Sequence, residues 1–281
     1  MKLVTNDYGC GTSSSIFDYG ISDVIVVSEN NYEHVFEADD DLFFVGHDFL
    51  LYLWDTPEKI EKWKSFQHSK SVWCFERIDA IIPAWEQKSH WSINQVKQFA
   101  DEIYACDEDD CDKYGYKWFP QWGSCKFFDQ RSTIPSKKEI LFSGQAGKPE
   151  YQARNEMLKF LLNHPAYANR LHISNVDRLL SWEDYVANLL SYEIILNPVG
   201  LLKAFNTRAY EVLYSGRILL QHTYGKYNRH AELLQGHDNG IMFSSFEELQ
   251  EADLSPKNNA ESFFLQNNIY ARFEKIGVTI K

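Results

Sequence analysis

The chain has 281 residues, of which 44% are hydrophobic and 24% charged, and its formal net charge is −12 at pH 7. It is long enough to form two compact domains. The sequence starts with the strand-like MKLVTND and has no apolar leader and no run of about 18 apolar residues. We therefore expect a cytoplasmic protein that neither enters the secretory route nor spans a membrane.

Cysteine content and charge distribution narrow the classes of partner. Five cysteines without a Cys-x-x-Cys pair predict neither a disulfide framework nor a zinc site. Residues 1–133 carry 12 lysines and arginines against 24 aspartates and glutamates, whereas residues 134–281 carry 16 against 16. An acidic surface repels a phosphate backbone, so the charge of the first part disfavours nucleic acid as a partner. Such a charge split is also compatible with a role in solubility alone.

The first half of the chain alternates short apolar runs with helical stretches. Buried strands are predicted at residues 2–5, 24–27, 42–45, 71–75, 102–105 and 117–119. Residues 128–138 break all periodicity and are the predicted linker. We therefore expect a first α/β domain over residues 1–133.

The second half shows the same alternation. Strands are predicted at residues 139–142, 170–174, 194–196, 217–221 and 240–243. Ser181 is placed to cap a helix over residues 181–190, and Ser245 with Glu248 forms a capping box. A βα series of this kind favours a mainly parallel sheet.

Two strand-to-helix junctions of the second half carry polar groups. The first runs through Ser143-Gly144-Gln145-Ala146-Gly147, where Gly144 lets the backbone approach an anion and Arg154 can reach the same place. A plain tight turn has the same signature. At the second, Asn206 can cap a helix that closes at Ser215-Gly216, and Arg208 and Glu211 lie near its start. This is where an α/β sheet binds a nucleotide, although a surface helix with a satisfied glutamate also fits.

The pattern Asn-x-Arg-x-x-Glu-x-x-x-x-Gly, met by Asn206, Arg208, Glu211 and Gly216, resembles the donor-site segment of GT-B glycosyltransferases. The likeness is greatest to the CgeB-like, spore-maturation-type branch of the group that includes glycosyltransferase family four. It implies an α/β fold of two Rossmann-like domains with mainly parallel sheets facing across a cleft. Residues 1–133 would be the acceptor-side domain, 134–258 the donor-binding domain, and 259–281 a helix that crosses back to the first.

The resemblance also implies an activity and residue roles. The chain would move a hexosyl or pentosyl group from a nucleotide-diphosphate sugar, such as a UDP-sugar, to an unidentified acceptor hydroxyl, with retention and without a metal or other cofactor. Glu211 would accept hydrogen bonds from the ribose hydroxyls. Asn206 and the Thr207 backbone would face the phosphates, and Arg154, Arg208 and Lys203 would offset their charge. Lys203 replaces the first glutamate of the family's Glu-x7-Glu signature.

Candidates for a catalytic base follow three predicted strands of the first domain. Asp7, the pair His47-Asp48, and Glu76 come directly after apolar runs, where side chains face a cleft. Each also fits an ordinary loop or cap residue, and a retaining route needs no dedicated base. The acidic runs 39–41 and 107–110 contain oxygen ligands that hard cations prefer, but both border strands, where solvated turns are expected, and no metal site is predicted.

Three alternatives remain open from the sequence. A glycosyltransferase acting on modified DNA bases requires a basic groove on the first domain. A non-catalytic GT-B nucleotide-binding protein is consistent with Lys203 in place of the first glutamate of the family's signature. A sugar-nucleotide epimerase has the same fold and acts on the donor with no acceptor present.

Overall fold

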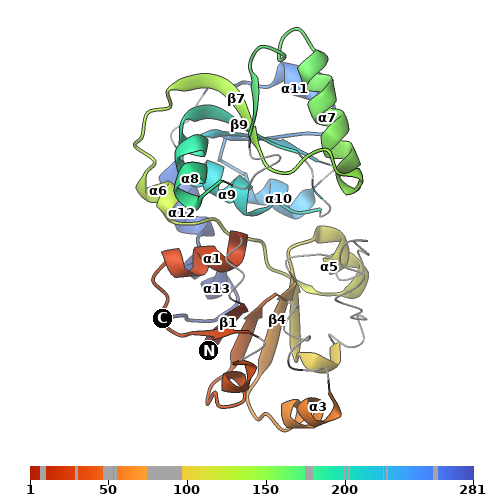
Figure 1. The fold of residues 1–281 in the computed structure, drawn as a ribbon, viewed down its shortest axis with the longest axis vertical. Coiled ribbons are helices and arrows are strands. Elements are labelled where there is room, and N and C mark those ends of the chain that lie inside the picture. The colour runs from red at the N-terminus through yellow and green to blue at the C-terminus, as the bar shows by residue number, and fades with distance from the viewer. Residues whose placement is uncertain are drawn as a thin grey trace. The chain divides into compact units, whose positions relative to one another are not determined.

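The chain folds into two compact α/β units. The computed structural model describes residues 1–6, 11–28, 31–46, 53, 56–74, 97–174, 180–198, 200, 203–223, 225, 227–255 and 259–281. One unit comprises Met1–Gln121 with Ile269–Lys281, and the other comprises Trp122–Asn268. Each unit contains one parallel sheet with helices beside it, which confirms the predicted α/β class with mainly parallel sheets (Figure 1).

The boundaries of the units differ from those expected from composition. The division falls at 121/122 rather than at 133/134, so the predicted linker belongs with the second unit. The segment 259–281, expected as one helix, forms two helices, α12 (Ala260–Asn267) and α13 (Ile269–Lys275). Helix α12 belongs to the second unit and α13 to the first.

The first unit is built on a six-stranded sheet in the order β2-β1-β3-β4-β5-β6. Its strands are β1 (Lys2–Asn6), β2 (Val24–Val27), β3 (Leu42–Val45), β4 (Lys70–Cys74), β5 (Glu102–Ala105) and β6 (Lys117–Trp118), and all neighbouring pairs are parallel. Its helices are α1 (Gly11–Asp18), η1 (Tyr32–Val35), α3 (Pro57–Lys64) and α5 (Glu108–Tyr114), together with α13. Because every residue of β3 is buried, the strand shows a continuous apolar run in the sequence.

The chain terminus completes the core of the first unit. Phe273 of α13 packs its ring 4.8 Å from that of Phe43 on β3 and 5.2 Å from that of Phe119. The carbonyl oxygen of Lys281 accepts a hydrogen bond of 2.9 Å from the Ser22 backbone. Residues that are far apart in the sequence therefore share one core, which the clustering of aromatic rings stabilises.

Carboxylates of both acidic runs, 39–41 and 107–110, form hydrogen bonds within the fold. Asp107 caps α5 by accepting a hydrogen bond of 3.0 Å from the Asp110 amide, and the acidic first turn of this helix suits the helix dipole. Asp40 binds the terminal amine of Met1 at 3.0 Å, and Asp41 accepts from the Ser69 amide at 2.8 Å. Within the described ranges, no group of three His, Cys, Asp or Glu side chains could hold a metal ion.

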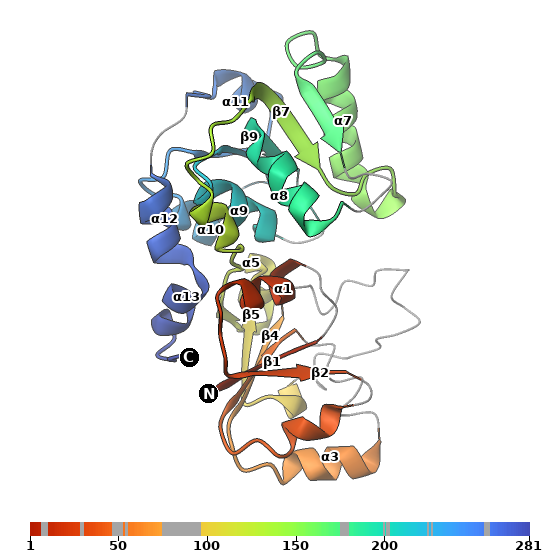
Figure 2. The ribbon, with the colours of Figure 1, turned by 60° about the vertical axis from the view of Figure 1, so that its left-hand side comes forward.

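The second unit is built on a five-stranded parallel sheet in the order β11-β10-β9-β7-β8. Its strands are β7 (Lys137–Ser143), β8 (Leu171–Ser174), β9 (Tyr192–Asn197), β10 (Ile218–His222) and β11 (Gly240–Phe243). Helices α7 (Gln152–Asn163) and α11 (Phe246–Glu251) contribute to the core on one face. On the other face the core contains residues of α6 (Lys126–Asp129), α8 (Trp182–Leu190), α9 (Thr207–Tyr214) and α12. The remaining short helices are η2 (Pro149–Tyr151) and α10 (Asn228–Leu233). Figure 2 labels β7 and β9 of this sheet, together with helices α7, α8 and α9 of the same unit.

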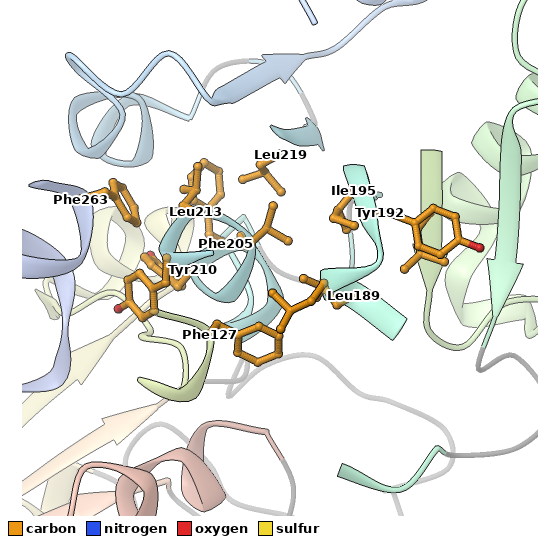
Figure 3. Packing of buried hydrophobic residues seen from close by; sticks show 14 of the residues in the cluster. Phe127, Leu189, Tyr192, Ile195, Phe205, Tyr210, Leu213, Leu219 and Phe263 are labelled. Carbon is orange, nitrogen blue, oxygen red and sulfur yellow. The ribbon is translucent and has the colours of Figure 1, made fainter. Parts of the chain in front are cut away.

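Helix α9 is held firmly by the second of these cores, which Figure 3 shows from close by. Its residues from Ala209 to Tyr214 are all buried. Phe127, Leu189, Tyr192, Ile195, Phe205, Tyr210, Leu213, Leu219 and Phe263 pack together in this cluster. The amide of Phe205, just before the helix, donates a hydrogen bond of 3.1 Å to Nε2 of His230, which is fully buried. The start of α9 is thus fixed by the buried residues of the helix and by the hydrogen bond of Phe205 just before it.

Two further expectations concern cysteines and membranes. Among the described residues, Cys74, Cys106 and Cys111 are buried, Cys125 is half-buried, and none of the four forms a disulfide. In the part of the chain that the structure describes, no helix has the length and apolar character needed to cross a bilayer.

Candidate functional site

Polar side chains gather at the carboxyl ends of three adjacent strands of the second unit. Ser143, Asn197 and Gln221 lie near the ends of β7, β9 and β10, and each follows a member of the α9-side core cluster by two residues. Because side chains alternate along a strand, all three point to the face that α9 covers. Asn197 Nδ2 donates a hydrogen bond of 2.6 Å to Oε1 of Gln221. Ligands of open α/β sheets bind outside this edge.

The start of α9 is tied to the end of β9 by a pair of asparagines. Asn206 caps the helix, as predicted, since its Oδ1 accepts a hydrogen bond of 3.3 Å from the Ala209 amide. Asn206 Nδ2 donates to Asn197 Oδ1 at 3.2 Å, and Asn197 Nδ2 donates to Asn206 Oδ1 at 3.1 Å. The helix ends at the predicted Ser215-Gly216, where Gly216 has a φ of 72°. The first turn of α9 therefore lies beside the strand ends.

Arg208 lies over the turn that follows β7. Its Nη1 donates to Asn197 Oδ1 at 3.4 Å. A Cβ atom built on Gly144 would approach Arg208 Nη2 to 3.0 Å, so the absence of a side chain at residue 144 lets the guanidinium lie against this turn. Ser143 Oγ and Arg208 Nε are buried, and neither forms a hydrogen bond with any described residue. Buried polar atoms are normally paired, so this edge of the sheet is suited to a polar partner.

Glu211 is buried on the same face of α9, with only 3% of its surface exposed. The hydroxyl of Tyr185 on α8 donates a hydrogen bond of 2.7 Å to Glu211 Oε2. Burial and the neighbouring carboxylate raise the pKa of Tyr185 well above its usual value, so the hydroxyl remains a donor. A Cβ atom on Gly123 would lie 2.8 Å from the Glu211 amide nitrogen. The carboxylate is therefore confined between α8 and the segment that contains Gly123.

Arg154 shapes the glycine turn from within α7. The arginine is 8% exposed, its Nη1 donates to the Gln145 carbonyl at 2.7 Å, and its guanidinium lies 4.3 Å from the centre of the Tyr151 ring. Asn155 adds two bonds, accepting from the Gly147 amide at 2.7 Å and donating to the Lys148 carbonyl at 2.9 Å. Arg154 and Asn155 thus hold the backbone of the turn that contains the predicted Gly144.

The other predicted site residues divide into two groups. Lys203 and Thr207 are half-buried, with Lys203 in the connection before Asn206 and Thr207 as the first residue of α9. The predicted base candidates Asp7, His47, Asp48 and Glu76 lie outside the described residues.

Several residues of this site were not among those predicted from the sequence. Asn197 has a local signal, because it is a polar residue at the end of a buried apolar run and directly before Pro198. Tyr185 and Gly123 have no such signal. They meet Glu211 only through the packing of separate segments.

The comparisons with known proteins concern the fold. No family profile matches this chain, and none of the curated proteins matches it. Among solved structures, an alpha-glucosyltransferase in complex with UDP and a 13-mer DNA containing a central A:G mismatch aligns with a TM-score of 0.57 and 11% identity. The alignment covers 99% of this chain and 98% of that chain. Together with the two parallel sheets, this similarity shows that the chain has the GT-B fold.

Proposed function

We propose that the protein is a glycosyltransferase that moves a sugar from a nucleotide-diphosphate donor, such as a UDP-sugar, to an acceptor hydroxyl. The observation that carries this proposal is the start of α9, where Asn206 and Arg208 bond to Asn197 at the carboxyl end of β9. On the same helix, the Glu211 carboxylate accepts a hydrogen bond from Tyr185 of α8. An alpha-glucosyltransferase of the same fold, whose structure is of a complex with UDP, supports the proposal. The CgeB-like resemblance of residues 206–216 supports it independently.

Each side chain has a role that its chemistry suits. The Glu211 carboxylate accepts hydrogen bonds from the ribose hydroxyls, since an ionised carboxylate has only acceptor sites. The Thr207 amide and the Asn206 side chain face the diphosphate, and Arg208 and Lys203 offset its charge. Arg154 holds the Gly144 turn in the conformation that receives the phosphates.

These groups act on the leaving diphosphate. In the transfer, the bond between the anomeric carbon and a phosphate oxygen breaks and the acceptor oxygen forms the new bond. The acceptor proton passes to the departing phosphate oxygen or to one of the candidate bases named below. The negative charge that grows on the diphosphate is stabilised by cations and amides that are already oriented. We propose retention of configuration without a metal ion, and Asp7, His47, Asp48 and Glu76 remain candidate bases.

DNA is a second candidate acceptor, because the structure of the fold neighbour is of a complex with a 13-mer DNA. The charge of this chain favours an acceptor other than DNA. The first unit, residues 1–121 and 269–281, carries 13 lysines and arginines against 24 aspartates and glutamates, and the second carries 15 against 16. Neither total has the basic excess typical of proteins that bind a phosphate backbone. Transfer assays on duplex DNA at low and physiological salt test this acceptor directly.

The donor site is tested by thermal shift with UDP, GDP, ADP, CDP and their sugars. A ligand at 100 times its Kd stabilises the folded state by about 2.7 kcal/mol, so one nucleotide should raise the midpoint clearly. Glu211→Gln should reduce this shift, whereas Glu232→Gln, the same change on the exposed face of α10, should keep it. A wild-type protein that no nucleotide stabilises, or a Glu211→Gln variant that responds fully, contradicts the proposal.

Product analysis then separates the catalytic alternatives. Donor incubated with the protein alone should remain intact if an acceptor is required. Conversion of the donor sugar without an acceptor indicates an epimerase, and nucleotide binding without turnover on any acceptor indicates a non-catalytic GT-B protein.

A further inference from the structure

We propose that Tyr185 is a positioning residue that gives the donor site its preference for ribonucleotides over 2′-deoxyribonucleotides, acting through Glu211. This role rests on the proposed function, because it presupposes that Glu211 receives the ribose of a nucleotide donor. The sequence pattern that indicates the donor site does not include Tyr185. The contact is between two helices that are separated in the chain.

The ring of Tyr185 is held in one orientation. It packs against Phe127, at a centroid distance of 5.9 Å with the rings nearly perpendicular, and against Trp182, at 5.6 Å, and these two rings are 5.9 Å from each other. Both neighbours belong to the second unit, and Phe127 is fully buried. Contact with two aromatic rings restricts the tyrosine ring, so the direction in which its hydroxyl points is set before any ligand binds.

The hydroxyl fixes the plane of the Glu211 carboxylate. The last torsion of a glutamate side chain is broad, so a carboxylate without a partner rotates easily. The 2.7 Å bond from Tyr185 restrains Oε2 and so favours one plane of the carboxylate. Arg208, one turn before Glu211 on α9, also faces the tyrosine hydroxyl. A buried carboxylate needs such donors, because burial without hydrogen bonds is costly.

A fixed carboxylate can distinguish a vicinal diol from a single hydroxyl. The 2′- and 3′-hydroxyls of ribose are adjacent donors that match a carboxylate held in one plane, and a 2′-deoxyribose lacks one of them. The segment around Gly123 limits movement on another side, where a Cβ atom would lie 2.9 Å from Glu211 Cγ. The carboxylate therefore cannot swing to improve its contact with the deoxy sugar. Without the Tyr185 hydroxyl, Oε2 loses one of the donors that orient it, and the discrimination should fall.

Calorimetric titration with UDP and 2′-deoxy-UDP, or with the matching pair for the nucleotide that stabilises the protein, tests this role. Wild type should bind the ribonucleotide about tenfold more tightly, as expected for a hydrogen bond to a charged group. Tyr185→Phe keeps the ring packing and should weaken ribonucleotide binding about five- to tenfold, with little change for the deoxynucleotide. The ratio of the two affinities should approach one.

Tyr214→Phe is the matched control. The Tyr214 hydroxyl also donates a bond of 2.7 Å, but to the carbonyl of Asn267 within the core. This variant should lower the thermal midpoint and leave the affinity ratio at the wild-type value. A double-mutant cycle with Glu211→Gln adds a second readout, since Tyr185→Phe should have no further effect on the ratio once the carboxylate is gone.

The outcomes separate the two proposals. If Tyr185→Phe keeps the wild-type ratio, or weakens both nucleotides equally, the tyrosine has only a structural role and the inference is overturned while the donor site stands. If the wild type binds neither nucleotide of any pair, the proposed function fails and the inference fails with it.

Discussion

The segment that contains Gly123 offers a sharp test of the site, because a single methyl group added there should displace Glu211. In Gly123→Ala the new Cβ atom would lie 2.8 Å from the Glu211 amide nitrogen, 2.9 Å from its Cγ and 3.2 Å from its Cα. Carbon atoms in protein interiors pack at about 3.5–4.0 Å. Two of these three neighbours are backbone atoms of α9, which cannot rotate away.

The cost follows from these distances. Gly123 is not among the glycines with positive φ, so alanine can adopt its backbone conformation and the effect is steric. Overpacking of this kind costs about 1–3 kcal/mol. For a domain of about 150 residues, each kcal/mol lowers Tm by roughly 2–4 °C. We therefore expect a fall of several degrees and, because Glu211 must move with the helix backbone, a loss of the nucleotide-induced shift.

Thermal unfolding with and without nucleotide measures both effects. Gly200→Ala is the matched control, since its Cβ atom would meet Arg154 Nη2 at an ordinary 3.6 Å and its φ is not positive. It should keep a Tm close to wild type. A Gly123→Ala protein with wild-type Tm and an unchanged nucleotide response would refute the close approach of this segment to Glu211.

Two further predictions concern stability. The buried guanidinium of Arg217 donates to three backbone carbonyls, those of Thr133, Leu190 and Ser215. Arg217→Met leaves these carbonyls without that donor and should cost about 3 kcal/mol in urea unfolding, whereas the exposed Arg170→Met should change stability by about 0.5 kcal/mol or less; equal effects would contradict the structural role. Burial lowers the pKa of His222, so the unfolded chain binds more protons than the folded one below about pH 6.5 and stability should fall as the pH drops from 7.5 to 5.5. His222→Gln should flatten this dependence, and superimposable Tm profiles for the two proteins would rule the contribution out.

The sheets could be predicted well from the sequence. The predicted runs 24–27, 42–45 and 240–243 coincide with β2, β3 and β11. Strands of parallel sheets have apolar neighbours on their faces, so their residues stand out in the sequence without any tertiary information. The ends of some strands differ from the prediction by a residue, because pairing with the neighbouring strand and not hydrophobicity sets them. Lys70, for example, extends β4 by pairing with Leu42.

The assignment of the connecting segment needed the structure. Irregular composition marked residues 128–138 as a linker, but it does not show which core they join. Phe127 is buried in the α9-side cluster, and the Thr133 carbonyl binds Arg217, so residues 122–133 belong with the second unit. These contacts join residues up to 84 positions apart, for which the sequence contains no periodic signal.

The residues of the candidate site also fall into two groups: those that a local pattern predicts and those that only the fold brings together. Local sequence is enough to predict that Asn206 caps a helix, that this helix ends at Gly216, and that Arg208 and Glu211 share its first turns, because caps, breakers and helical spacing are local properties. That Tyr185 and Gly123 confine the Glu211 carboxylate is seen in the folded protein alone. The reason is physical: α8 and the segment around Gly123 meet α9 through the packing of elements on one sheet, and that packing depends on the whole core.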